Sequence, residues 1–170
     1  MGAPMIDERI AIVVSALLFT FVLSVTGSMA GSASEPATAE AQSAPLPNSA
    51  EQVVAYVTRA LTAHDLGAFE RLVEWKGARP IRKRMTLAQI RYCFGRPIRS
   101  AVVEPFPADG LQQAKSLLGL DPNVPVTERL RVVFDEPPTS FGDLPTSVFL
   151  LGKEDGVYRV SLLLASGPPN

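Results

Sequence analysis

The sequence has one cysteine, Cys93, and one histidine, His64, among its 170 residues. A single cysteine excludes an intramolecular disulfide, and one cysteine with one histidine provides too few ligands for a four-ligand zinc site. The sequence also lacks the G-x-S-x-G pattern of a nucleophile elbow and the phosphate-binding pattern G-x-x-x-x-G-K-[ST]. Stability must therefore come from packing, and we expect neither a metal nor a cofactor.

The chain also has little net charge, since 16 Lys and Arg stand against 17 Asp and Glu, a formal charge of −1. Nucleic-acid binders are often basic over the whole domain, so a nucleic-acid partner is not expected. The charges are unevenly placed, however, because residues 76–103 contain eight basic residues and no acid. Within this segment the tetrapeptide Arg-Pro-Ile-Arg occurs twice, at 79–82 and 96–99.

Residues 10–34 have no charged side chain, and the stretch IAIVVSALLFTFVLSVTG within them is strongly apolar. Small side chains follow it, as a signal peptidase requires, so residues 1–33 are predicted to be a signal peptide. The apolar stretch is also close to the length of about 20 residues that spans a bilayer, so an uncleaved N-terminal membrane anchor is the alternative. Both predict an extracytoplasmic body, periplasmic or secreted. Residues 34–48, rich in Ala, Ser, Pro and Glu, are predicted to be a disordered linker.

A single domain is predicted over residues 49–165, followed by a flexible tail at 166–170. Capping patterns and apolar spacing predict helices at 49–63 and 64–75 and a short third helix at 86–94 that starts at Thr86. Strands are then predicted near 97–104 and 127–138, with a helical turn at 111–118 between them and a hairpin turning near 153–156. The predicted fold class is α+β, with N-terminal helices packed on a curved, mostly antiparallel sheet of about four strands.

The order of these elements, together with the sequence DLGAFERLV in the second predicted helix, resembles the nuclear-transport-factor-like superfamily, which includes ketosteroid isomerase. The sequence also resembles secreted bacterial proteins of unknown function. The superfamily resemblance implies a cone-like domain with a pocket between helices and sheet, which some members use for catalysis and others for binding or dimerisation. Catalytic members place carboxylates, tyrosines or an Asp–His pair in that pocket, and no such motif matches here residue by residue.

Several residues could carry chemistry, each with a structural alternative. His64 and Asp65 could form a dyad, or Asp65 could cap the second helix while His64 lies near the end of the first. Cys93 could be a thiolate stabilised by the neighbouring Arg91, or a buried thiol. The strand-end carboxylates Glu104 and Asp135 could pair in acid–base work or be solvated. One further side chain, Trp75, is expected in the core.

The basic segment suggests an anion-binding site made of Arg79, Arg82, Lys83, Arg84, Arg96 and Arg99. The first four precede the third predicted helix, whose N-terminal amides favour anions, and the last two follow it. The alternative is a solvated surface whose cations pair with acids such as Glu70, Glu74 and Glu104.

Three functions remain open from the sequence. The first is an exported, non-catalytic ligand-binding or protein-interaction domain without catalytic residues. The second is an isomerase- or dehydratase-type enzyme with an acid in the pocket. The third is an electrostatic adaptor that binds anionic lipid or polymer through residues 76–99. The corresponding partners are a small ligand or a protein, an anionic surface, or a second copy of the chain in a homodimer.

Overall fold

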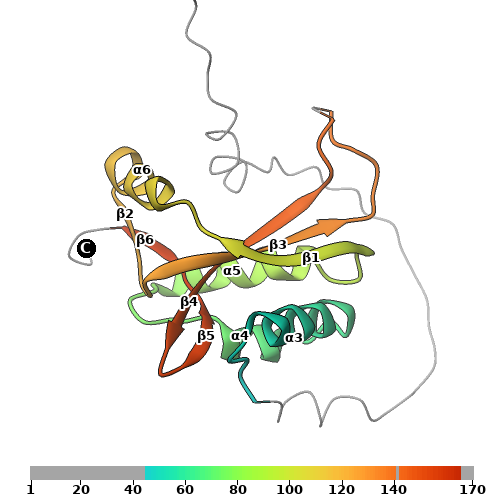
Figure 1. The fold of residues 1–170 in the computed structure, drawn as a ribbon, viewed down its shortest axis with the longest axis horizontal. Helices are drawn as coiled ribbons and strands as arrows, with labels where there is room; N and C mark the ends of the chain where they lie inside the picture. The colour runs from blue at the N-terminus through green and yellow to red at the C-terminus, as the bar shows by residue number, and fades with distance from the viewer. Residues whose placement is uncertain (1–44, 141, 166–170) are drawn as a thin grey trace, which may run out of the picture. The chain divides into compact units, whose positions relative to one another are not determined.

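The computed structural model describes residues 45–140 and 142–165, all within one compact unit, Ala37–Asn170 (Figure 1). The predicted signal peptide or anchor (1–33), the linker up to residue 44 and the tail (166–170) lie outside the described residues. The last residues of the predicted linker contact the domain. Leu46 packs against the core, and the backbone N–H of Tyr158 donates to the Pro47 carbonyl at 2.7 Å.

Two helices begin where their capping residues predict. In α3 (Ala50–Thr62) the Ser49 side chain accepts a hydrogen bond from the backbone N–H of Gln52 at 3.3 Å. In α4 (Leu66–Leu72) Asp65 accepts from the N–H of Ala68 at 3.0 Å. These bonds satisfy donors that a helix start otherwise leaves unpaired. The second helix is shorter than the predicted 64–75, because Val73 turns into an extended bridge with Val160.

The third helix, α5 (Pro80–Tyr92), begins six residues before its predicted start at Thr86. Pro80 is its first residue, a position that suits proline because its fixed φ is helical and its missing N–H would be unpaired there. Thr86 is buried in the middle of the helix and does not cap it. The prediction of 86–94 was therefore wrong at its start, and Arg82, Lys83 and Arg84 lie on a helix instead of a preceding loop.

The predicted α+β class is confirmed, with a four-stranded antiparallel sheet in the order β1-β3-β4-β5. The strands are β1 (Ile98–Pro105), β3 (Val126–Phe134), β4 (Thr146–Glu154) and β5 (Val157–Val160). The hairpin between β4 and β5 turns at Asp155 and Gly156, whose φ angles of 50° and 78° suit a tight hairpin turn. The predicted cone-like shape is not confirmed and stays a prediction.

A second, smaller sheet was not predicted. After α6 (Ala108–Leu118), β2 (Leu120–Pro122) pairs with β6 (Leu163–Ala165) as an antiparallel ribbon. Asn123 attaches this ribbon to the segment after α4, since its Nδ2 donates to the carbonyls of Glu74 and Lys76 at 2.8 and 3.1 Å. Its Oδ1 accepts from the Leu162 N–H at 2.8 Å and the Ser161 hydroxyl at 3.2 Å.

One apolar core joins the helices to the main sheet. Its largest fully buried side chains come from both layers: Phe69, Phe134, Leu61, Leu72, Leu130 and Leu151. The Phe69 ring of α4 packs against the rings of Phe94 and Phe149, with centroid distances of 6.3 and 5.8 Å. Side chains therefore occupy the space between helices and sheet in which the family resemblance implies a pocket.

Candidate functional site

The helix α5 presents apolar side chains to solvent on the side opposite its buried face. Its buried positions are Thr86, Leu87 and Ile90. Ile81, Met85 and Tyr92 are 51%, 52% and 61% exposed, and Ala88 between them is exposed as well. Spacings of three and four residues place these side chains one above another along a helix. We call Ile81, Met85, Ala88 and Tyr92 the α5 stripe.

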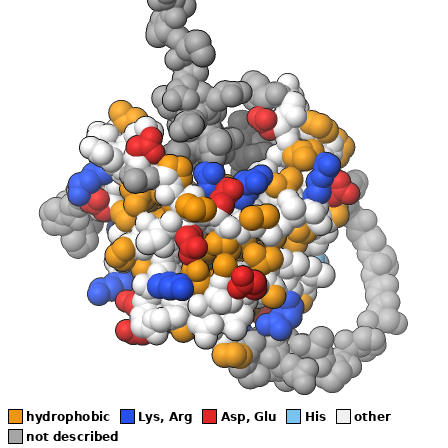
Figure 2. Space-filling model, in the orientation of Figure 1, with side chains coloured by type: hydrophobic (Ala, Val, Ile, Leu, Met, Phe, Trp, Pro, Cys, Tyr) orange, Lys and Arg blue, Asp and Glu red, His pale blue; other side chains and the backbone are white. Residues whose placement is uncertain are grey.

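Basic side chains flank the α5 stripe, and no acid lies on α5. At about 100° per residue, Arg84 and Arg91 lie on one side of the stripe and Arg82 on the other. Arg84 and Arg91 are exposed, as is Arg79 just before the helix, and none of these three forms an ion pair within the described part of the chain. By contrast, the face of the molecule shown in Figure 2 carries acidic and basic side chains in mixture.

The N-terminal end of α5 carries cations at the positive end of its helix dipole. Arg79 occupies the capping position and makes no capping hydrogen bond, and the first turn has no acid. The unpaired N–H groups of a helix start carry partial positive charge, so each nearby cation is unfavourable by about 0.3–1 kcal/mol when exposed. In α3 the same positions hold Ser49 and Glu51, which favour the helix. The cluster of cations at the start of α5 is therefore not explained by helix stability.

The six cations predicted as one anion-binding site fall into two groups at opposite ends of α5. Arg79, Arg82, Lys83 and Arg84 lie at its start, and Arg96 and Arg99 follow its end. A helix of 13 residues is about 20 Å long, so the two groups do not converge on one small anion. The hypothesis of six converging cations reduces to a cluster at the start of α5.

Two of the six cations have partners inside the domain. The Lys83 ammonium lies 3.5 Å from a carboxylate oxygen of Glu70 and 5.1 Å from the centre of the Trp75 ring. The expectation that Glu70 pairs with a cation of the basic segment is confirmed. Arg96 makes two hydrogen bonds to Glu136, at 2.7 and 2.6 Å, and its guanidinium lies 3.9 Å from the centre of the Phe134 ring. The hydrogen bonds that Arg96 donates to the Glu136 carboxylate raise the pKa of Arg96 and lower the pKa of Glu136. Arg96 therefore anchors the segment after β3.

The remaining candidate cations and acids are also placed. Arg99 is exposed on β1. Glu104, one of the acids expected to pair with the six cations, instead accepts from Arg129 at 2.8 Å and from Arg131 at 3.2 Å. Glu74 accepts from the backbone N–H of Lys76 at 2.8 Å. Asp135 is exposed just after β3, six residues beyond Arg129, the residue opposite Glu104 in the sheet. Six strand residues span about 20 Å, so these two carboxylates do not form an acid–base pair.

His64 and Asp65 have separate structural roles. The Asp65 carboxylate caps α4, whereas the His64 ring stacks on Phe94 with a centroid distance of 5.5 Å. A Cβ at Gly95 would lie 2.8 Å from Nε2 of His64, and Gly95 has a φ of 69°, so glycine is needed beneath this ring. The helix-cap alternative for Asp65 is confirmed.

Cys93 is buried, as one of its two alternatives predicted. Its Sγ lies 3.2 Å from the Ser147 hydroxyl and 3.5 Å from the Gln89 carbonyl. Burial raises the pKa of the Cys93 thiol, and the smaller opposing effects of Ser147 and Arg96 do not reverse this. The thiol form is therefore favoured, and Arg91 does not generate a thiolate here.

A tyrosine–carboxylate pair was missed by the sequence analysis. Tyr158 is buried, and its hydroxyl donates to Glu128 at 2.7 Å. Burial, together with the carboxylate, raises the pKa of Tyr158 to about 12. The phenol therefore keeps its proton and directs it at Glu128, which suits a structural bond more than proton exchange with a ligand.

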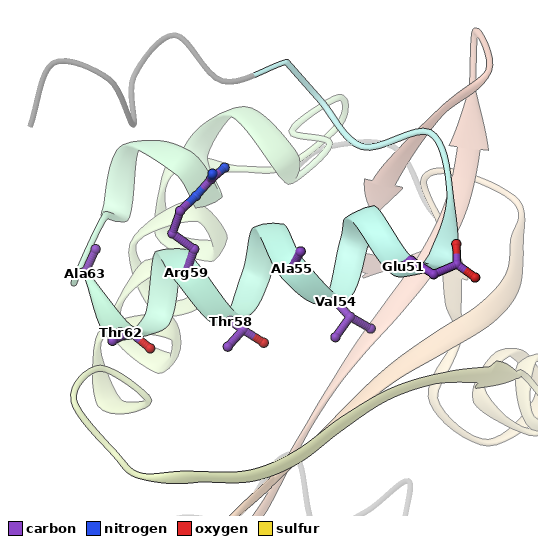
Figure 3. A pocket seen from close by; sticks show the side chains of 7 residues that line it. All are labelled: Glu51, Val54, Ala55, Thr58, Arg59, Thr62 and Ala63. Atoms are coloured by element: carbon purple, nitrogen blue, oxygen red, sulfur yellow. The ribbon is translucent and has the colours of Figure 1, made fainter. Parts of the chain in front are cut away.

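An open hollow of about 710 Å³ lies along the outer face of α3 (Figure 3). It is lined by Glu51, Val54, Ala55, Thr58, Arg59, Thr62 and Ala63. Its two charged residues, Glu51 and Arg59, are eight positions apart, or about 12 Å along the helix axis. Small and apolar side chains make up the rest, so the described side of this hollow brings no reactive pair together. Among the described residues, no three His, Cys, Asp or Glu side chains gather as a metal site.

The sequence carries a signal for the α5 stripe, because the spacing of Ile81, Met85, Ala88 and Tyr92 is helical. This spacing begins before Thr86, the predicted start of the third helix. No helix in the described ranges is both long and apolar enough to cross a bilayer.

The chain matches no protein-family model, no curated protein and no solved structure. The resemblance to the nuclear-transport-factor-like superfamily therefore stays a prediction.

Proposed function

We propose that this protein is an exported, non-catalytic interaction domain that binds its partner through the outer face of α5. The observation that carries the proposal is the α5 stripe, with Arg84 and Arg91 on one flank and Arg82 on the other. Single exposed apolar side chains are common on soluble proteins, but aligned ones rimmed by polar residues mark interaction sites.

The arrangement of charge supports the same surface. Cations at the start of α5 oppose its helix dipole, and an anionic partner at that end would relieve the repulsion. The filled core favours an external binding surface over an internal ligand pocket. The charge-free apolar stretch at residues 10–34 is the support for export.

Hydroxyl-radical footprinting of the full chain tests the proposal. Oxidation of Met85 is compared between the cell fraction in which the protein resides and the purified protein. We expect Met85 to be protected in the cell fraction, while Leu117 of α6, which is 75% exposed, is oxidised equally in both. Equal oxidation of Met85 in both samples would contradict the proposal.

A further inference from the structure

We infer that the partner of α5 is the surface of an anionic lipid bilayer, an inference that rests on the proposed function. In this arrangement α5 lies parallel to the membrane plane. The side chains of Ile81, Met85 and Tyr92 enter the boundary between headgroups and acyl chains, and the arginines contact lipid phosphates.

Charge complementarity is the first argument. Every ionised side chain from residue 76 to residue 103 is basic, and exposed arginines stand at the start of α5 (Arg79, Arg84) and in its last turn (Arg91). An anionic bilayer presents negative charge along the whole length of a helix lying on it. A small anion could engage one end of α5 only, since the helix is about 20 Å long.

The side chains of the stripe suit the same interface. Long arginine side chains beside an apolar stripe can extend to the phosphates while the stripe is buried, and tyrosine is favoured at the level of the headgroups. A basic helix with one apolar face is typical of surface-bound helices. If residues 10–34 remain as the membrane anchor that their sequence allows, the domain is already held near a bilayer, and a weak contact through α5 is then sufficient.

The test places an environment-sensitive fluorophore on the stripe of the full chain, as Met85→Cys. Because Cys93 is buried and burial raises the pKa of its thiol, the unsubstituted chain serves as the labelling blank. A label at Thr62→Cys, exposed on the outer face of α3, is the matched control. A label on α5 reports contact by this helix even when another part of the chain holds the protein on the vesicle.

With phosphatidylcholine vesicles that contain phosphatidylglycerol, we expect the emission of the label at residue 85 to shift to the blue, and that at residue 62 to stay unchanged. The shift should be lost near 1 M salt, where the screening length falls to about 3 Å. Arg84→Glu with Arg91→Glu should raise the lipid concentration for half the shift by about tenfold or more. Arg59→Glu with Lys153→Glu, which changes the net charge equally at exposed sites elsewhere, should leave it unchanged.

The absence of a blue shift with anionic vesicles, in a labelled chain whose circular dichroism shows the native fold, would overturn the inference. An equal shift with pure phosphatidylcholine would overturn it as well, because charge would then play no part. If Met85 is nevertheless protected in the cell fraction, the proposed function stands with an acidic protein or polymer as the partner. Loss of both signals would refute the proposed function itself.

Discussion

The uncapped start of α5 leads to the prediction that Arg79→Ser stabilises the domain. Arg79 has a φ of −68° and a ψ of 153°, the extended conformation that a capping residue adopts. A serine there should accept a hydrogen bond from the N–H of Arg82, as Ser49 accepts from Gln52 in α3. The change also removes one cation from the positive end of the helix dipole.

The two effects have the same sign and can be estimated. A serine cap contributes about 1 kcal/mol relative to an uncapped helix start. Removal of the unfavourable charge adds about 0.3–1 kcal/mol. Together they predict an increase of about 1–2 kcal/mol in the free energy of unfolding. For a domain of about 120 residues, each kcal/mol raises the melting temperature by about 4 °C.

Urea denaturation of the wild type and the variant measures this increase directly. The matched control is Arg91→Gln in the last turn of α5, where a cation favours the helix dipole. Since Arg and Gln have similar helix propensities, this change should lower stability by about 0.3–1 kcal/mol. If Arg79→Ser proves neutral or destabilising, then it is wrong that a missing cap and an unfavourable cation weaken the start of α5. A stabilised variant with weaker vesicle contact would show that Arg79 is retained for binding.

Three further outcomes are expected. Glu136→Gln should make the stability of the domain less sensitive to acid. Arg96 lowers the pKa of Glu136, so in the wild type the pair contributes its full stability above pH 4.5 and loses this contribution as the pH falls through the lowered pKa. The variant has no carboxylate at this position and should not show this loss. An acid titration of the melting temperature that is unchanged in the variant would contradict this. Asn123→Ala should lower the free energy of unfolding by about 3 kcal/mol, because it removes the bonds to the Glu74 and Lys76 carbonyls and leaves the Leu162 N–H unpaired. The Ser161 hydroxyl keeps its bond to the Val124 carbonyl at 2.9 Å. A loss below about 1 kcal/mol in urea would refute the role assigned to Asn123. Cys93, buried and with a raised thiol pKa, should react with a thiol reagent only as the protein unfolds, so rapid labelling of the folded chain would count against its burial.

The features predicted correctly from the sequence are those set by nearby residues. The caps at Ser49 and Asp65 depend on donors three positions away, and the hairpin at 153–156 depends on its own turn residues. The start of α5 was missed because proline is found both just after a helix and at the first position of one. Pro80 follows the second predicted helix by five positions and is the first residue of α5.

Contacts between distant residues could not be predicted from one sequence. Arg96 and Glu136 are 40 positions apart, and only the pairing of β1 with β3 brings them together. The ribbon of β2 and β6 likewise depends on Asn123, whose partners include backbone groups up to 49 positions away. The concentration of basic residues in 76–103 is visible in the sequence. Its division between the two ends of α5 depended on knowing that residues 80–92 are helical.

Site-specific photo-crosslinking from the α5 stripe tests the central claim most directly. A benzoylphenylalanine at Met85 in the full chain, irradiated in the cells that make it, should form a crosslink to a lipid or to another molecule. The same residue at Thr62 on α3 should form far fewer crosslinks. Equal and low crosslinking at both positions would show that the outer face of α5 has no partner and would contradict the account.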